Sequence, residues 1–314
     1  MRAIWLHGFG GPEVLVAGDA EDPVPGPGQA LIDVAFANIT FVETQFRATG
    51  KGPFAGALPM IPGNGVGGVV AAVGAGADPA LVGRRVVSGT GGSGGYAERV
   101  AVDAAALIPV PDGLTLDAAV ALLADGRTAT MLVRAAAPRP GERVLVEAAA
   151  GGVGTLLVQL ARGAGATVVA AAGGQRKLAV ARELGADVVV DYGPDGWTDR
   201  VGPLDVVFDG VGGDVARAAF GCLRRGGRMV SFGLASGAWA DVDDAEAEAA
   251  GVTLVRPARP TPETMRADTE RALAEAAAGR LRPLIGQRFP LARAADAHAA
   301  IQSRATVGKT LLEV

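Results

Sequence analysis

The sequence predicts an α/β protein in which a β-rich first part is followed by a doubly wound parallel sheet. Residues 1 to about 118 hold short strand-like runs between Gly- and Pro-rich turns, whereas strands and helices alternate from about residue 119 onward. The strands of the second part are four to six residues long and almost entirely apolar. Such strands are buried on both faces, as in a parallel sheet covered by helices. The regular alternation favours the doubly wound arrangement.

The first part predicts a compact, barrel-like β domain. Its strand-like runs are evenly spaced, and surface loops such as EDPVPGPGQA separate them. The expected strands are Ala30–Ala35, Gly68–Val73, Arg84–Ser88 and Ala97–Val102.

The second part predicts a series of strand–helix units. The expected strands are Arg143–Glu147, Thr167–Ala171, Asp187–Val190, Leu204–Phe208, Arg228–Phe232 and Thr253–Arg256. The expected helices are Gly152–Ala164, Gln175–Leu184, Gly213–Leu223 and, after Pro257, a charged amphipathic helix over Thr261–Ala278.

The composition narrows the classes of function. The chain has 314 residues and a mean hydropathy of +0.31, which excludes disorder, and its net charge of −4 gives no reason to expect nucleic acid or an anionic membrane as partner. It has one cysteine, Cys222, and two histidines, His7 and His298, so a metal site would have to be built mostly from carboxylates. No signal-peptide-like start and no apolar run of about 18 residues occurs, so we expect a soluble cytoplasmic protein.

A glycine-rich turn, AAAGGVG, joins the first strand and helix of the second part. Ala149 takes the place of the first glycine of the dinucleotide pattern G-x-G-x-x-G, Gly151 that of the second and Gly154 that of the third. The second position lets a pyrophosphate approach the backbone, and the third lets the helix pack closely on the strand. Because a strand precedes the turn and a helix follows it, dinucleotide binding is favoured over a purely structural turn. The expected contacts are Ala150, Gly151, Gly152 and Val153.

The end of the second strand favours NADPH over NADH. An NAD enzyme usually carries Asp or Glu there, for the ribose hydroxyls. This chain instead reads Ala171-Ala172-Gly173-Gly174, followed by Gln175-Arg176-Lys177. An acid would repel a 2′-phosphate, and the two cations would attract it. The alternative is that Arg176 and Lys177 are ordinary solvated helix residues.

Seven segments carry a resemblance to a known family. They are TFVETQFRATG (40–50), IPGNGVGGVVAAVGAG (61–76), EAAAGGVGTLLVQLARGAGA (147–166), RELGADVVVDY (182–192), DVVFDGVGG (205–213), GGRMVSFG (226–233) and SRATVGKTLLEV (303–314). In this order they resemble the medium-chain dehydrogenase/reductase superfamily and, within it, the zinc-independent, zeta-crystallin-like quinone oxidoreductases. The resemblance covers essentially the whole chain.

The resemblance implies a split fold. Residues 1–118 and 257–314 would form a GroES-like catalytic domain, and residues 119–256 a Rossmann NADPH-binding domain inserted between them. Substrate and nicotinamide would meet in a cleft. Similar proteins often dimerise by joining Rossmann sheets edge to edge, so the resemblance also implies a homodimer, with the apolar run Val252–Val255 as the edge strand.

The metal ligands of zinc-dependent members of the superfamily are missing. Their Gly-His-Glu reads Gly63-Asn64-Gly65 here, and neither Asn nor Gly replaces a His–Glu pair at a catalytic zinc. Their four-cysteine structural lobe is also absent. The sequence therefore predicts no metal site.

Cofactor-binding positions are implied by the resemblance. Lys177, Tyr192 and Arg304 match residues that hold the 2′-phosphate, and Gly173 provides the space. The alternatives are a half-buried core aromatic for Tyr192 and a solvated surface residue for Arg304. The positions that match residues lining the nicotinamide half are Thr128, Phe232, Gly233 and Leu234.

The substrate side departs from the family. Family members commonly carry Asn at the position of Thr40 and tyrosines nearby, and this chain lacks both. Thr40 is the positional candidate for a hydroxyl that orients nicotinamide or substrate, although it also fits an ordinary strand residue. Asn38, two residues earlier on the same expected strand face, is a substitute candidate. Asp125, in an expected turn before Gly126, fits a proton carrier or a helix cap. Arg47 fits either a group that steers a carbonyl oxygen or a surface helix cation.

These features predict a zinc-independent enzyme that transfers hydride from NADPH to a small-molecule quinone. Quinones accept hydride readily, so positioning in a cleft that excludes water would supply most of the acceleration. One alternative is an enoyl or α,β-unsaturated carbonyl reductase, which would favour a side-chain acid. An alternative of another class is an NADPH-binding sensor or structural protein without turnover.

Overall fold

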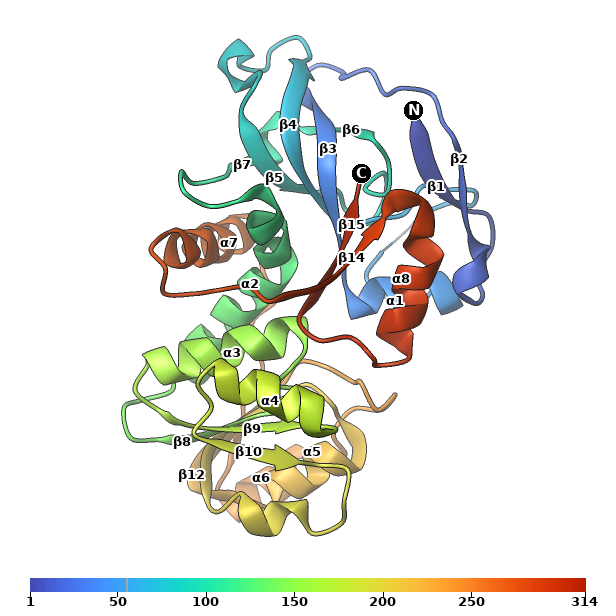
Figure 1. Cartoon of the computed structure of the whole chain (residues 1–314). Helices are drawn as coiled ribbons and strands as arrows, with labels where there is room; N and C mark the ends of the chain where they lie inside the picture. The colour runs from blue at the N-terminus through green and yellow to red at the C-terminus, as the bar shows by residue number, and fades with distance from the viewer. Residues whose placement is uncertain (55) are drawn as a thin grey trace. The chain divides into compact units, whose positions relative to one another are not determined.

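The computed structural model describes residues 1–54 and 56–314, and the chain divides into two compact units (Figure 1). Unit 1 consists of Met1–Ala124 and Thr269–Val314, and unit 2 of Asp125–Asp268. The chain passes from one unit to the other after residues 124 and 268, and both positions lie inside helices. No change in composition marks them. The functional domain limits expected near residues 118 and 256 stay a prediction.

Unit 1 is the β-rich part. Its strands are β1 (Arg2–Leu6), β2 (Leu15–Asp19), β3 (Gln29–Ile39), β4 (Gly65–Val73), β5 (Arg85–Gly89), β6 (Arg99–Asp103), β7 (Ile108–Pro109), β14 (Ile285–Pro290) and β15 (Lys309–Glu313). Its helical segments are α1 (Phe41–Thr49), α8 (Ala294–Gln302) and the short 3-10 turns η1 (Pro12–Val14), η2 (Pro79–Leu81), η3 (Ala104–Ala106) and η5 (Leu291–Arg293). The four strands expected in this part are all confirmed, each shifted or extended by a few residues.

The seven-stranded sheet of unit 1 contains strands from both the N-terminal and the C-terminal part of the chain. The strand order is β14-β15-β3-β4-β5-β7, and β6 pairs with β3. The C-terminal β15 runs antiparallel to β3, with Thr310 opposite Ile39 (Figure 1). Alternate residues of β3, beginning with Ala30, Ile32 and Val34, point into the core, which is the period of two expected for a strand with one covered face.

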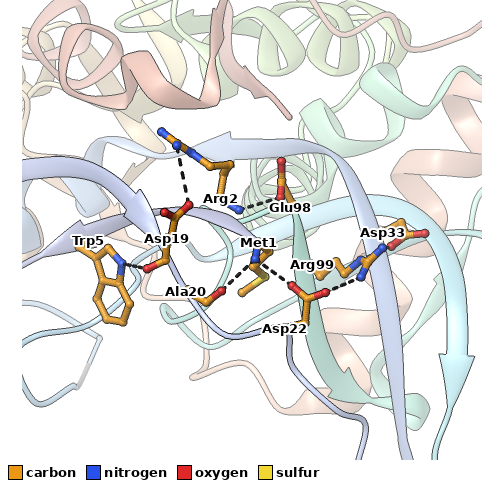
Figure 2. Close-up of polar contacts among 9 residues, drawn as sticks. All are labelled: Met1, Arg2, Trp5, Asp19, Ala20, Asp22, Asp33, Glu98 and Arg99. Atoms are coloured by element: carbon orange, nitrogen blue, oxygen red, sulfur yellow. Dashed lines mark hydrogen bonds and ion pairs between the residues drawn. The ribbon is translucent and has the colours of Figure 1, made fainter.

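Ion pairs tie the β1–β2 hairpin to the main sheet of unit 1 (Figure 2). The N-terminal ammonium of Met1 donates to the carbonyl of Ala20 and pairs with Asp22, both at 2.9 Å. Arg99 of β6 then bridges Asp22 at 2.7 Å and Asp33 of β3 at 2.9 Å. Asp22, in the segment after the hairpin, is therefore held to the seven-stranded sheet by Arg99, which Asp33 holds in turn.

Unit 2 contains a six-stranded parallel sheet with the order β10-β9-β8-β11-β12-β13. The strands are β8 (Arg143–Val146), β9 (Thr167–Ala172), β10 (Val188–Asp191), β11 (Leu204–Asp209), β12 (Leu223–Ser231) and β13 (Thr253–Leu254). The helical segments are α3 (Gly152–Gly163), α4 (Gln175–Glu183), η4 (Trp197–Arg200), α5 (Gly213–Phe220) and α6 (Asp244–Ala250). In Figure 1, α3 and α4 cover one face of this sheet and α5 and α6 the other.

This strand order confirms the doubly wound prediction. The first strand of the sheet, β8, lies at its centre, and the order reverses between β8 and β11, which is where ligands bind in such sheets. All six residues of β11 are buried, as expected for a strand covered by helices on both faces. β13 lies at the edge, where Val252–Val255 was expected.

The long helices at the unit limits are α2 (Leu116–Ala136) and α7 (Pro262–Ala277). α7 confirms the predicted amphipathic helix, but α2 corrects the prediction of a turn at Asp125 and Gly126. Asp125 lies in the middle of α2, so it does not start this helix. The segment is rich in Ala and Leu, so one interior glycine, which costs about 1 kcal/mol, does not end the helix.

Candidate functional site

The turn between β8 and α3 is shaped by close packing. A Cβ on Gly154 would stand 2.3 Å from the carbonyl oxygen of Ala148, and one on Gly152 would stand 1.9 Å from Oδ2 of Asp125. The obstacle at Gly154 is backbone, so this position requires glycine, whereas a Cβ on Gly152 would require the Asp125 side chain to move. Ala149, in the place of the first glycine, is fully buried.

The N-terminus of α3 offers donors for an anion. Gly151 is the N-cap and has no side chain to cap the helix, and the first turn of α3 holds no acidic residue of its own, while the carboxylate of Asp125 from α2 lies beside Gly152. A Cβ on Gly151 would contact only the carbonyl oxygen of Ala148 at 3.3 Å, so the backbone is open to close approach there. Ala148 has a φ of 47°, a strained conformation of the kind that is concentrated at ligand sites. These groups fit the pyrophosphate of a dinucleotide. Of the predicted contacts, Ala150 is buried, and Gly151, Gly152 and Val153 are half-buried.

A carboxylate lies where the ends of β9 and β10 meet. Asp191 of β10 stands opposite Ala172 of β9. Its Oδ2 accepts a hydrogen bond from the backbone N of Gly174 at 3.1 Å, and its Oδ1 accepts one from Gly193 at 2.9 Å. The sequence of β9 alone shows no acid at this edge, because Asp191 comes from the neighbouring strand. Both of its oxygens hold the backbone of the two turns.

The residues expected around a 2′-phosphate lie in both units. A Cβ on Gly173 would stand 3.5 Å from Cε2 of Tyr192, so the tyrosine ring lies against this glycine. Lys177 is in the first turn of α4, and both Lys177 and Tyr192 are half-buried. Arg304 follows α8 in unit 1, is exposed and has a φ of 57°. Contact of all three side chains with one phosphate stays a prediction, because the units are separate bodies.

The residues expected near the nicotinamide lie in a second tightly packed region of unit 2. Phe232, Gly233 and Leu234 follow β12, and a Cβ on Gly233 would stand 2.6 Å from the carbonyl oxygen of Gly210. The loop after β12 therefore packs directly on the loop after β11. Thr128 lies on α2 and is half-buried.

Two carboxyl groups are buried at the point where the strand order reverses. Glu147 follows β8, Asp209 ends β11, and both are fully buried. Oδ1 of Asp209 accepts hydrogen bonds from the backbone N atoms of Val211 at 3.0 Å and Gly212 at 2.7 Å. No hydrogen bond from the described part of the chain satisfies either oxygen of Glu147. Burial, and then the neighbouring Asp209, raise the pKa of Glu147 well above its usual value, which favours its neutral form.

Thr40 lies at the start of a helix in unit 1. β3 ends at Ile39, and Thr40 is the N-cap of α1, which corrects the prediction that Asn38 and Thr40 share one strand face. Glu43 reaches back to it: Oε2 of Glu43 accepts hydrogen bonds from the backbone N of Thr40 at 2.7 Å and from its hydroxyl at 2.8 Å. The Thr40 side chain is therefore oriented by a carboxylate on its own helix.

Glu43 connects Thr40 to a buried polar chain. Oε1 of Glu43 accepts from the backbone N of Asn64 at 3.0 Å and from the hydroxyl of Tyr96 at 3.2 Å. The Tyr96 hydroxyl also lies 3.0 Å from Nε2 of His298. Burial raises the pKa of Glu43 and, well above its usual value, that of Tyr96. Burial and the nearby Arg47 charge lower the pKa of His298 to about 3, so this imidazole is neutral.

Two other polar candidates of unit 1 are buried. Asn38 is fully buried, and neither atom of its amide has a hydrogen-bond partner in residues 1–54 and 56–314. Arg47 is 1% exposed and donates to the carbonyl of Gly10, so its interpretation as a surface helix cation is wrong.

The segment Gly63-Asn64-Gly65 holds no metal-binding side chain, and the backbone of Asn64 serves Glu43 instead. Over the residues that the structure describes, no three His, Cys, Asp or Glu side chains are grouped so as to hold a metal ion. The same residues include no helix that is long and apolar enough to cross a membrane.

Comparison with known proteins identifies the family. Residues 26–112 match the model of the alcohol dehydrogenase GroES-like domain, and residues 184–312 match the model described as zinc-binding dehydrogenase. A quinone oxidoreductase of Pseudomonas aeruginosa is 33% identical, with 99% of each chain covered. The chain belongs to the quinone oxidoreductase branch of the medium-chain dehydrogenase/reductase superfamily.

Two further members of this superfamily are informative. The structure of the Escherichia coli quinone oxidoreductase complexed with NADPH is 30% identical, covers 100% of both chains and superposes with a TM-score of 0.91. A 2-haloacrylate reductase of Burkholderia sp is 32% identical and covers 99% of this chain and 98% of its own. These relatives are thus named for different hydride acceptors, a quinone and a 2-haloacrylate.

Three residues of this medium-chain reductase escaped the sequence analysis. Glu43 has a recognisable signal, because Thr40-x-x-Glu43 is the pattern of a capping box. Glu147 also has one, since an acid directly after the apolar residues Val144-Leu145-Val146 of β8 is unusual. Asp191 has no local signal as a neighbour of Gly174, because the pairing of β9 with β10 brings them together.

Proposed function

We propose that this chain is an NADPH-dependent oxidoreductase that transfers hydride from NADPH to a small-molecule quinone. The observation that carries the proposal is the phosphate-binding turn at the start of α3, beside a β9 end that has no acid of its own. Support comes from the relatives, since the Pseudomonas protein is named a quinone oxidoreductase and the Escherichia coli structure holds NADPH.

The proposal assigns the cofactor to residues of both units. Backbone groups of Ala150–Val153 would bind the pyrophosphate, and Gly173 would leave room for the 2′-phosphate. Lys177, Tyr192 and Arg304 would bind that phosphate. The loop Phe232–Leu234 and Thr128 would line the nicotinamide half.

The chain's own residues contribute positioning. NADPH supplies the hydride when bound, and a quinone accepts it without needing a strong acid from the protein. Thr40 orients a ligand group, and the tight turn around Gly154 fixes the phosphates, so the reacting atoms are held together. For Asn38 and Asp125, both buried, we propose a supporting role, because neither side chain is exposed enough to touch a substrate directly.

An α,β-unsaturated carbonyl reductase is the second candidate. The observation that favours it is the similarity, over the whole chain, to the 2-haloacrylate reductase. Such a reaction also needs a proton at the carbon next to the carbonyl. The Thr40 hydroxyl donates to Glu43, so this reaction would take its proton from water.

Steady-state oxidation of NADPH tests the proposal. The acceptors are 1,4-benzoquinone, 9,10-phenanthrenequinone and simple enones, with NADH as the alternative donor. We expect turnover with quinones and a clear preference for NADPH. Tight NADPH binding without turnover of any acceptor would favour a sensor, and equal rates with NADH would overturn the cofactor assignment.

The proposal includes three finer statements about zinc, assembly and location. The enzyme is zinc-independent, supported by the replacement of the Gly-His-Glu motif, so chelators should leave its activity unchanged. It forms a homodimer in the cytoplasm, with the edge strand β13 as the contact, supported by the position of β13 in the sheet. Sedimentation of the wild-type protein and of a Leu254→Lys variant tests the dimer.

A further inference from the structure

The hydroxyl of Thr40 has one proton, and the structure shows where it goes. It lies 2.8 Å from Oε2 of Glu43, which also accepts the backbone N–H of Thr40. A threonine hydroxyl donates one hydrogen bond and accepts through its lone pairs. With its proton given to Glu43, Thr40 can only accept a hydrogen bond from a ligand.

Glu43 is held in the state that takes this proton. Two backbone N–H groups, of Thr40 and Asn64, donate to its two oxygens, one to each, and an N–H can never accept in return. The Tyr96 hydroxyl adds a donor to Oε1. Glu43 is 5% exposed, so water does not replace these partners. The two backbone N–H groups require an acceptor lone pair on each oxygen, and the Thr40 hydroxyl donates to the same Oε2 that accepts from its own backbone N–H.

We propose that Glu43 is a positioning residue that fixes the Thr40 hydroxyl as a hydrogen-bond acceptor, so that Thr40 binds a donor group of the nicotinamide half of NADPH and not the quinone. This inference rests on the proposed function. A quinone offers only carbonyl oxygens, which are acceptors, and Thr40 has no proton for them. The carboxamide N–H groups and ribose hydroxyls of NADPH are donors.

Glu43→Gln, Thr40→Val and the double variant test the inference. Glu43→Gln keeps the shape, but its amide N–H can donate to Thr40 and so reverses the polarity of the hydroxyl. Loss of one such hydrogen bond should raise the Kd for NADPH about tenfold in each single variant. The KM for 1,4-benzoquinone should change less than about twofold. The double variant should bind NADPH no more weakly than Thr40→Val, because Glu43 acts through Thr40.

Two variants control for folding. Thr40→Ser keeps the hydroxyl and should restore NADPH affinity relative to Thr40→Val. Asp78→Ala removes an exposed cap of η2 in the same unit, where Asp78 accepts from the backbone N of Ala80 at 2.9 Å, and should leave the kinetics unchanged. Thermal melting shows which variants fold, and if Glu43→Gln does not, the comparison of Thr40→Val with Thr40→Ser decides.

The outcomes separate this inference from the proposed function. Wild-type protein that binds NADPH but reduces no quinone refutes the proposed function, while the NADPH titration still tests Glu43 and Thr40. Active wild type with unchanged NADPH affinity in Glu43→Gln refutes the inference alone. The inference is also refuted if Thr40→Val raises the KM for quinone and leaves the Kd for NADPH unchanged. It is refuted as well if the fold-increases in the Kd for NADPH of the two single variants multiply in the double variant.

Discussion

Gly154 and Ala148 lie so close that a Cβ on Gly154 would stand 2.3 Å from the Ala148 carbonyl oxygen. The obstacle is backbone, so Gly154→Ala must displace the turn that precedes α3. We expect this variant to weaken NADPH binding at least about tenfold and to lower the melting temperature, since overpacking of this kind costs roughly 1–3 kcal/mol.

Gly163→Ala is the matched control for Gly154→Ala. Gly163 is the last residue of α3, and a Cβ there would have no neighbour within 4 Å. The added methyl should leave NADPH affinity unchanged and stabilise the helix by up to about 1 kcal/mol. Equal effects of the two substitutions on the Kd for NADPH would contradict the importance of the turn.

The pH dependence of stability should report on Glu147. Its folded pKa is raised by burial and by Asp209 above the unfolded value of about 4.3. The folded state therefore binds the extra proton, so the stabilisation is complete below the unfolded pKa and is lost as pH rises through the folded pKa. Glu147→Gln keeps the shape and cannot ionise. Its melting temperature should therefore rise relative to that of wild type as the pH increases from 5 to 9. A constant difference over this range would show that folding does not raise the pKa of Glu147.

Much of the fold could be predicted because its signals are local. The apolar strands of unit 2, the Gly151–Gly154 turn and the charged α7 each show their structure within a short window of sequence. α2 was missed around Asp125 because a glycine in a sequence indicates a break, whereas this one lies in a long run of strong helix formers.

The site was less predictable because its contacts are distant in sequence. Tyr96 contacts Glu43 over 53 positions and His298 over 202, and no periodicity links such residues. Arg47 has the spacing of an exposed helix residue, yet the carbonyl of Gly10 and the surrounding core enclose it. The local pattern therefore identified Thr40 as a candidate but not the carboxylate that orients it.

Lys177 should decide the preference for NADPH. It lies in the first turn of α4, beside the Gly173–Tyr192 contact at the end of β9. Lys177→Ala removes a charge-assisted contact to the 2′-phosphate and should raise the KM for NADPH about tenfold or more, with the KM for NADH unchanged. Arg182→Ala, an exposed cation in the last turn of the same helix, is the control and should alter neither. A parallel loss with both cofactors would assign Lys177 to the structure of α4.

His298 should make unit 1 sensitive to acid. Burial and the Arg47 charge hold its folded pKa at about 3, below the unfolded value of about 6.5. Between these two pKa values the unfolded chain binds a proton at His298 that the folded chain does not bind. The stabilisation from the neutral buried imidazole is therefore present above about pH 6.5 and is lost as pH falls toward 3. We expect the melting temperature to drop between pH 7 and 4 in wild type and to drop less in His298→Gln. His7→Gln, at the exposed position of the other histidine, is the control and should retain the full wild-type drop.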